Sequence, residues 1–312
     1  MLNQRFSAVT RTRTGTTRDH HYDLDNTGGF VSADVRPASW LRVVGALRAD
    51  RFDGEFVNRV NGARTPILDY GTIWQPKVSA SVQPNRAAQF YASYGRAFQI
   101  GAGSAAYGLK SLDASKNDGY ELGLRSTPHR DVTLRVALWR QTATDEVRLK
   151  PDNSGDSENI GETKRDGVDF EATWRVHSRL TLWGAYTVQK GKFVNPGSRP
   201  ADALLRGKEI DHIPDFTLKA GVDAELTKAL SLSLSLIGQG DYHLLPANRT
   251  EQFGDYTLVN ADLRYRWKKA TFGLHVKNAL DKRYGYVWND GAQSLFSPGD
   301  ARAVLGSVSF EF

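Results

Sequence analysis

Apolar and polar residues alternate along most of this chain, and no other feature of the sequence restricts its fold so strongly. The clearest run is Ser231–Leu236, in which serine and leucine take turns. The even positions of 216–226 and the odd positions of 257–267 are mainly apolar, while their neighbours are mainly polar. Because successive side chains of a β-strand point to opposite faces, this period predicts strands with one apolar and one polar face. Helical spacing is rare, so an all-β chain is expected.

Strand length and connection length separate the two folds that produce such strands, a soluble sandwich and a membrane barrel. Many alternating runs reach the roughly 9–11 residues that a tilted strand needs to cross a bilayer. Short links alternate along the chain with long segments, the short ones at 84–86, 128–131, 177–178, 227–229 and 268–269, and the long ones at 99–116, 150–162, 191–212, 240–254 and 284–301. Short turns at one rim and long loops at the other are typical of outer-membrane barrels, so we predict an antiparallel transmembrane β-barrel of about fourteen strands. The apolar sets of 216–226 and 257–267 should face outward.

Composition excludes several other classes of protein. The chain has 312 residues and a mean hydropathy of −0.48, and it contains no apolar run long enough for a helical membrane span. It has no cysteine, which excludes thiol catalysis, thiolate metal sites and disulfides. The net charge of +6 is spread along the chain, so nucleic acid is not an expected partner. No hydrolase, zinc or phosphate-loop motif occurs and no Ser/His pair stands out, so we expect no enzyme, no cofactor and no metal site.

The two ends of the sequence lead to further expectations. The first residues form no secretory signal, so either the protein is cytoplasmic or its true beginning is missing here. At the other end, Val308, Phe310 and Phe312 alternate with smaller or polar residues. This ending looks like the C-terminal strand signal that the bacterial barrel-assembly machinery reads. Nine aromatic residues near predicted strand ends suggest interfacial belts, although aromatics are also good strand formers: Trp40, Trp74, Tyr91, Tyr94, Trp139, Trp174, Tyr186, Tyr265 and Trp267.

Several ordered segments together resemble one known family, the TonB-dependent receptors. The segments include a Pro turn at 35–37 and an Asn/Asp turn near the end. In chain order they are 26–30, 35–37, 41–50, 76–81, 91–98, 119–125, 167–172 and 276–284. Each segment is weak alone, but their order and spacing are specific. The resemblance implies an outer-membrane receptor for energy-coupled uptake of a ferric siderophore or a similar large nutrient, located in the Gram-negative outer membrane once exported.

The sequence also departs from that family. Receptors of this type carry a signal peptide, a box for the energy-coupling protein and a plug, followed by a barrel of roughly 22 strands. We therefore expect residues 1–312 to be the C-terminal part of such a barrel. An incomplete gene, a decayed gene and an expression fragment are the three origins that would produce it. Contact with the TonB complex would then require a longer form with a plug. A passive porin-like channel, or a receptor for cobalamin, haem or a saccharide, remains an alternative.

Two groups of residues are candidates for function. Charged residues on polar strand faces should line the lumen and face a plug, with mutual pairing favoured over ligand contact: Arg48, Asp50, Glu121, Arg125, Asp169, Glu171, Arg264 and Arg266. Residues of the long loops are candidates for contact with an iron chelate: Tyr107, Lys110, His212, Tyr242, His243, Arg249, Tyr286 and Trp288. We expect the long-loop rim, formed by 99–116, 191–212, 240–254 and 284–301, to be extracellular and to carry any ligand recognition. The apolar strand faces should contact outer-membrane lipid.

Overall fold

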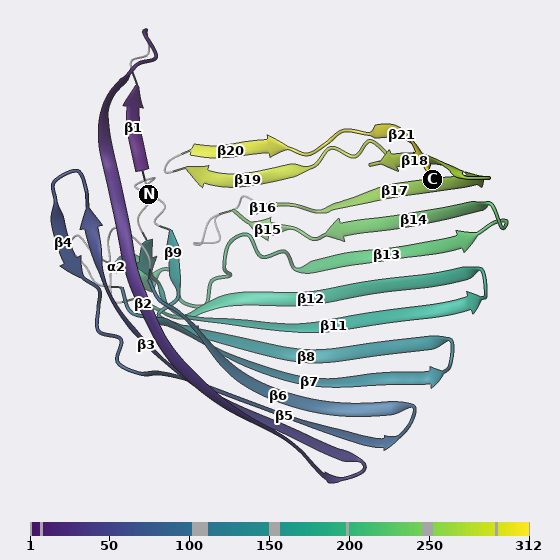
Figure 1. The fold of residues 1–312 in the computed structure, drawn as a ribbon, viewed down its shortest axis with the longest axis horizontal. Coiled ribbons are helices and arrows are strands. Elements are labelled where there is room, and N and C mark those ends of the chain that lie inside the picture. Colours follow the sequence, from purple (N-terminus) through teal and green to yellow (C-terminus); the bar gives the residue numbers. More distant parts are fainter. Residues whose placement is uncertain are drawn as a thin grey trace.

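The fold is that of a computed structural model, which describes residues 2–6, 9–101, 112–149, 157–197, 200–244, 252–290 and 293–311. Fourteen strands follow one another in a single curved antiparallel sheet (Figure 1). In spatial order they are β1 (Leu2–Phe6), β2 (Arg13–Ala38), β3 (Leu41–Asn58), β5 (Ile73–Asn85), β6 (Ala88–Gln99), β7 (Ser115–His129), β8 (Val132–Thr144), β11 (Gly161–His177), β12 (Leu180–Pro196), β13 (Phe216–Glu225), β14 (Leu230–Gln239), β17 (Tyr256–Trp267), β18 (Ala270–Lys277) and β21 (Ala303–Phe310). The predicted fold class and strand number are confirmed.

The remaining elements are short. Strand β4 (Ala63–Pro66) pairs with β3, and three small hairpins stand apart from the main sheet: β9 (Val147–Leu149) with β10 (Ser157–Asn159), β15 (Tyr242–His243) with β16 (Gln252–Phe253), and β19 (Gly285–Asp290) with β20 (Gln293–Pro298). The helix α2 (Pro200–Ala203) has a single turn. Among the described residues, no helix is both long and apolar enough to cross a membrane.

The two ends of the sheet differ as the connection lengths predict. Links of two to four residues join consecutive strands at one end, on the right in Figure 1, at 39–40, 86–87, 130–131, 178–179, 226–229 and 268–269. The long connections and the small hairpins lie at the other end. The structure adds that three of the long segments contain hairpins of their own. The first and last strands, β1 and β21, do not pair with each other, so the sheet is open within the described part of the chain.

The register gives the sheet one apolar and one polar face. Ala220 lies opposite Leu236, and Leu236 lies opposite Val259, so the apolar positions of 216–226 and 257–267 share a face, as predicted. Large apolar side chains on this face are exposed across the sheet, among them Leu122, Leu138, Phe170, Leu234, Leu274 and Val308. A row of exposed apolar groups on a sheet is what a lipid environment would cover.

The packed apolar core lies instead among the loops. Four small clusters of buried side chains sit at the long-loop end of the strands, and none of them extends along the sheet. The most enclosed is centred on Phe193, which is 1% exposed and packs with Ile160, Leu205 and Ile210. Side-chain packing therefore stabilises the loop end, whereas the backbone ladder holds the strands.

Candidate functional site

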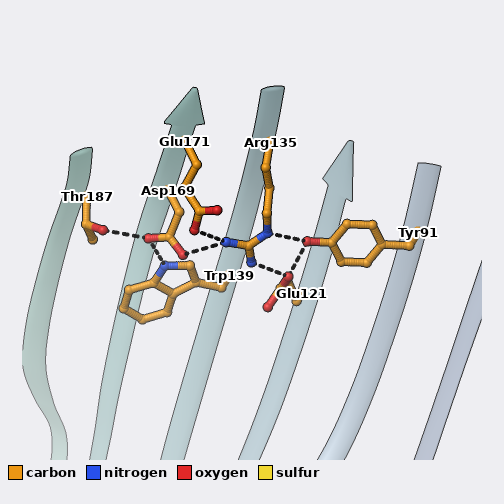
Figure 2. A network of polar contacts seen from close by, with 7 residues as sticks. All are labelled: Tyr91, Glu121, Arg135, Trp139, Asp169, Glu171 and Thr187. Carbon is orange, nitrogen blue, oxygen red and sulfur yellow. Dashed lines mark hydrogen bonds and ion pairs between the residues drawn. The ribbon is translucent and has the colours of Figure 1, made fainter. Parts of the chain in front are cut away.

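A network of polar side chains joins the strands β6, β7, β8, β11 and β12 on the polar face, with Arg135 of β8 at its centre (Figure 2). The Arg135 guanidinium donates to Glu121 Oε1 at 2.9 Å through Nη2 and to Glu171 Oε1 at 2.7 Å through Nη1. Its Nε donates to the Tyr91 hydroxyl at 3.2 Å, and that hydroxyl donates in turn to Glu121. One arginine thus connects β6, β7 and β11 through charge-assisted hydrogen bonds.

Asp169 extends the network toward β12. Its Oδ1 accepts hydrogen bonds from Trp139 Nε1 at 3.1 Å and from Thr187 Oγ1 at 2.9 Å, and its Oδ2 lies 3.8 Å from Arg135 Nη1. Three carboxylates, those of Glu121, Asp169 and Glu171, therefore surround one guanidinium. The network carries excess negative charge, which would attract a cationic group on this face of the sheet.

Two glycines make room for the aromatic members of the network. A Cβ at Gly123 would lie 2.3 Å from Cζ of Tyr91, and a Cβ at Gly167 would lie 2.2 Å from Cζ2 of Trp139. Both rings therefore lie flat across a neighbouring strand where only hydrogen is tolerated. These glycines belong to segments 119–125 and 167–172, so close approach of an aromatic ring accounts for a glycine in each.

The network corrects part of the sequence analysis. Tyr91 and Trp139 were expected in interfacial belts, but both point to the polar face, where their polar atoms have partners. Arg135 and Thr187 were not predicted at all. The sequence pattern does indicate that Arg135 lies on the polar face, because it stands between the apolar residues Leu134 and Val136 in the alternating run 132–138.

The predicted lumenal residues fall into three groups. Glu121, Asp169 and Glu171 meet in the network, and Arg125 lies with its Cζ 4.9 Å from the centre of the Tyr91 ring, a cation–π contact. Arg264 and Arg266 are exposed and form no side-chain ion pair with any described residue. Whether any of these groups faces a plug stays a prediction.

Arg48 and Asp50 form a separate site on β3. The Arg48 guanidinium binds the Asp50 carboxylate in bidentate fashion at 2.6 and 2.7 Å, and Gln75 Nε2 donates to the same carboxylate at 2.6 Å. Asp50 is only 1% exposed. Such a buried, fully bonded carboxylate serves the sheet rather than a ligand, which agrees with the favoured role of mutual pairing.

A further polar chain crosses the last three strands of the sheet. His275 Nδ1 lies 2.5 Å from Asp262 Oδ1, and His275 Nε2 lies 3.1 Å from Ser307 Oγ. The sequence analysis found no Ser/His pair, because the partners come from β18 and β21 and only the register brings them together. The order of groups matches a hydrolytic triad, but catalysis also needs a substrate cleft, and Ser307 lines none of three grooves found among the described residues.

At the long-loop rim, His212 links three loops. Its Nδ1 lies 2.9 Å from Asp211 Oδ2, its Nε2 lies 2.9 Å from the carbonyl oxygen of Val287, and its backbone N–H donates to the carbonyl of His243. Both ring nitrogens face acceptors, which only the protonated imidazole satisfies. The hydrogen bond to Asp211 accordingly raises the pKa of His212 above its ordinary value, against the opposing effect of burial.

Other rim residues pack around this contact. Tyr242 is 8% exposed and packs with Leu244, Val287 and Phe253. His243 Nε2 lies 3.4 Å from Glu209 Oε2, whereas its buried Nδ1 has no hydrogen-bond partner among the described residues. Tyr286, in contrast, is 56% exposed and is accessible to a ligand.

Some predicted residues cannot be placed. Tyr107, Lys110, Arg249 and Phe312 lie outside the described residues, as does the side chain of Trp288. Val308 and Phe310 lie on β21, both more than half exposed on the apolar face. Among the described residues, no group of three or more His, Asp or Glu side chains is arranged to hold a metal ion.

Comparisons with known proteins agree with this architecture. The family model described as "TonB dependent receptor-like, beta-barrel" matches residues 3–279. The chain is 26% identical to the ferrichrome outer membrane transporter/phage receptor of Escherichia coli (strain K12), over 88% of this chain and 37% of that protein. It is 22% identical to the metal-pseudopaline receptor CntO of Pseudomonas aeruginosa (strain PAO1), over 88% of this chain and 39% of that protein.

A solved structure extends the comparison to the fold. The unliganded ferric citrate transporter FecA superimposes with a TM-score of 0.82 at 13% identity, covering all of this chain and 49% of that one. The chain therefore spans less than half the length of these proteins. At 13% identity this superposition shows a similarity of fold only.

Proposed function

The chain belongs to the family of TonB-dependent receptor-like β-barrels, and on that premise we propose that residues 1–312 form one continuous part of the wall of a receptor that takes up a ferric siderophore or a similar metal chelate. Its relatives are receptors and transporters of the Gram-negative outer membrane, and that membrane is the compartment of this chain. The observation that carries the proposal is the family match across residues 3–279, on a sheet with an exposed apolar face and a charged polar face.

The two faces and two rims suit distinct partners. The apolar face fits outer-membrane lipid, and the polar face with its acidic network fits a lumen that holds a plug. Val308, Phe310 and Phe312 are proposed to be read by the barrel-assembly machinery, and contact with TonB is proposed only for a longer form that carries a plug. The long-loop rim, with segments 99–116, 191–212, 240–254 and 284–301, is proposed to face outside.

The substrate class follows from the relatives and from the rim. Two relatives are named for ferrichrome and for metal-pseudopaline, which are both metal chelates. This favours such a chelate over cobalamin, haem or a saccharide, and it favours a receptor over a passive channel. The proposed contact residues are Tyr107, Lys110, His212, Tyr242, His243, Arg249, Tyr286 and Trp288. Of the four with described side chains, Tyr286 is the most exposed, and buried Tyr242 would act by holding the rim in shape.

We infer further that the chain is not an enzyme. The family consists of receptors and transporters, and the Asp262–His275–Ser307 chain is open on the polar face, with side-chain exposures of 40% and 30% for Asp262 and His275. We propose that the Asp262–His275–Ser307 chain has a structural role and holds β17, β18 and β21 together.

A chimaera tests the proposed function. The matching segment of the E. coli ferrichrome transporter is replaced by this chain, while the rest of the host protein is retained. In cells that lack other receptors, we expect energy-dependent accumulation of iron-55 from at least one ferric chelate in a panel of hydroxamate, catecholate and carboxylate types. A control chimaera carries the host's own loops in place of 240–254 and 284–301 and should regain the host's preference.

The opposite result is equally clear. A chimaera that reaches the outer membrane in folded, heat-modifiable form but admits small sugars without energy, and no chelate, would favour the passive channel.

A further inference from the structure

The short-turn end of the sheet gathers basic side chains that lie far apart in the sequence. No run of more than two Lys or Arg residues occurs along the chain, but each of the six short links has such a residue in it or within two positions of it. These basic turn residues are Arg42, Arg86, Arg130, Arg179, Lys228, Arg266, Lys268 and Lys269. In the same stretches only Asp131 and Glu225 are acidic, and Glu311 lies nearby, since its backbone N–H donates to the carbonyl of Lys269.

Most of the basic turn residues have no acidic partner. Arg42 Nη2 binds Asp34 Oδ2 at 2.7 Å, and Arg130 Nε lies 3.3 Å from Asp131 Oδ2. The others are exposed and form no ion pair with any described residue: Arg86, Arg179, Lys228, Arg266, Lys268 and Lys269. A surplus of positive charge therefore stands at this end of the sheet.

Two of the turns that carry these cations are fixed by their own side chains. Asn85 Oδ1 accepts two backbone N–H groups in the turn of Arg86, at 2.8 and 3.0 Å. Thr227 Oγ1 accepts two in the turn of Lys228, at 3.1 and 3.0 Å. Such bonds hold a turn in one conformation, so both cations project from preformed positions.

The cations form an extended row and not a pocket. Successive short links are separated by two strands, which is about 10 Å, so the six links extend over about 50 Å along the curved end of the sheet (Figure 1). No basic turn residue lines any of three grooves found among the described residues. A small anion would meet only one or two of these charges, whereas a polymer with repeated negative groups would meet several.

We propose that the short-turn end docks on peptidoglycan, a polymer whose peptide side chains bear free carboxylates. The proposal rests on the outer-membrane location and on the orientation of the long-loop rim given under the proposed function, which directs the short turns into the periplasm. Peptidoglycan is the extended anionic polymer that lies beneath the outer membrane there.

Charge and position both favour this polymer over other anions. Lysine and arginine donate charge-assisted hydrogen bonds to carboxylates, but a single exposed ion pair is weak, so recognition needs several such contacts at once. The exposed apolar face ends at residues such as Val176 and Trp267, and the cations of the following links, among them Arg179 and Lys269, lie beyond it. They are therefore placed to meet a polymer in the water below the membrane, and headgroups within the membrane would reach them less directly.

The test measures how much of the full chain, folded in a non-ionic detergent, sediments with purified sacculi. The R86Q/R179Q/K228Q variant removes one unpaired cation from each of three turns and should bind about tenfold less than the original chain. Binding of the original chain should fall by a similar factor on sacculi whose carboxylates have been amidated. R86K/R179K/K228R keeps the charges and should retain binding.

The matched control removes the same charge from the opposite end of the sheet. K190Q/K192Q/K208Q changes three exposed lysines at the long-loop end, none of which forms an ion pair with a described residue. This variant should sediment as the original chain does. Heat-modifiable migration in electrophoresis reports that each variant is folded.

Several outcomes would overturn the proposal. One is equal sedimentation of R86Q/R179Q/K228Q and the original chain, and another is equal binding to native and amidated sacculi. An equal loss in K190Q/K192Q/K208Q would assign binding to total charge and not to the short turns. Retention of phosphatidylglycerol in place of sacculi, dependent on the same three cations in native mass spectrometry, would identify a lipid site instead.

Uptake separates this proposal from the proposed function. The chimaera that carries R86Q/R179Q/K228Q should accumulate iron-55 as the unsubstituted chimaera does. Failure of sacculus binding with uptake intact would therefore count against docking alone, and failure of uptake in the unsubstituted chimaera would count against the proposed function.

Discussion

The main sheet, called the wall below, and the long-loop end, called the rim, both contain large aromatic side chains, but the two regions are stabilised differently. On the wall, Phe170 is 46% exposed on the apolar face, and the polar face is tied together by side chains such as Arg135. In the rim, Phe193 is 1% exposed inside a small apolar cluster. The wall therefore depends on its backbone ladder and on polar pairing, whereas the rim depends on packing. Truncating a large apolar side chain should therefore destabilise the rim much more than the wall.

The largest effect is expected from Phe193→Ala. Removing a fully packed ring leaves a cavity and typically costs about 3–5 kcal/mol. Because this ring joins β12 to Leu205 and Ile210, the loss should fall on the segment 200–215 and leave the sheet intact. Hydrogen exchange resolved along the chain should show faster exchange in 200–215 and unchanged exchange in β7 and β8.

Phe170→Ala is the matched control for that variant. It removes the same ring from the exposed apolar face and should leave exchange in 200–215 unchanged. Equal loosening of the rim by both variants would contradict the division between wall and rim.

A smaller effect is expected from Arg135→Ala, which attacks polar pairing in the wall. It leaves Glu121, Asp169 and Glu171 without their shared cation, and hydrogen bonds to charged groups contribute about 1.5–3 kcal/mol. Denaturant unfolding of the detergent-folded chain should show a loss of about 2 kcal/mol. Arg266→Ala, at an exposed site with no ion pair among the described residues, should change stability little. An Arg135→Ala chain as stable as the original would mean that the network is not needed by the wall.

Next comes Gly123→Ala, which tests the close approach of Tyr91. The new methyl group would overlap the Tyr91 ring, and overpacking costs about 1–3 kcal/mol. Gly45→Ala places the same methyl on β3, where no atom lies within 4 Å, and should be neutral or slightly stabilising. The difference between the two unfolding midpoints is the measurement, and identical midpoints would refute the steric argument.

The smallest effect is a pH dependence of the rim. The pKa of His212 is raised in the folded state, so its contribution is fully present at pH values below the ordinary histidine range and is lost as pH rises through the raised pKa. Protection of residues 285–298 from hydrogen exchange, corrected for intrinsic rates, should fall between pH 5.5 and pH 8.5. His212→Asn keeps a residue suited to the positive φ of 60° at this position and should abolish that fall. A fall of the same size in the variant would assign it to another group.

The wall could be predicted closely because its pattern is local. The alternation in 216–226 and 257–267 predicts β13 (Phe216–Glu225) and β17 (Tyr256–Trp267) almost to the residue. Alternate residues of a strand point to opposite faces, so the sequence pattern correctly predicts that Glu121 and Asp169 lie on the polar face. Their partner Arg135 was not found, because pairing depends on the register between strands, which no single strand encodes.

The rim was predicted only as a set of long connections. Its hairpins β9–β10, β15–β16 and β19–β20 have strands of six residues or fewer. In strands this short, an alternation of apolar and polar residues does not stand out from chance. Burial was missed for the same reason. Tyr242 was chosen as a ligand contact on its chemistry, yet it is enclosed by Phe253 and Val287 from other parts of the loops.

The order of the strands has a consequence for how the sheet forms. Every strand of the main sheet lies beside the strand of that sheet that precedes or follows it along the chain. Contacts between neighbouring strands close either a short link or one long loop, and because the entropy cost of closure grows only slowly with loop length, each step costs little chain entropy. The sheet can grow one hairpin at a time, and each new strand finds its hydrogen-bonding partner already in place. The wall can therefore be completed strand by strand, either in the order of the chain or in the reverse order.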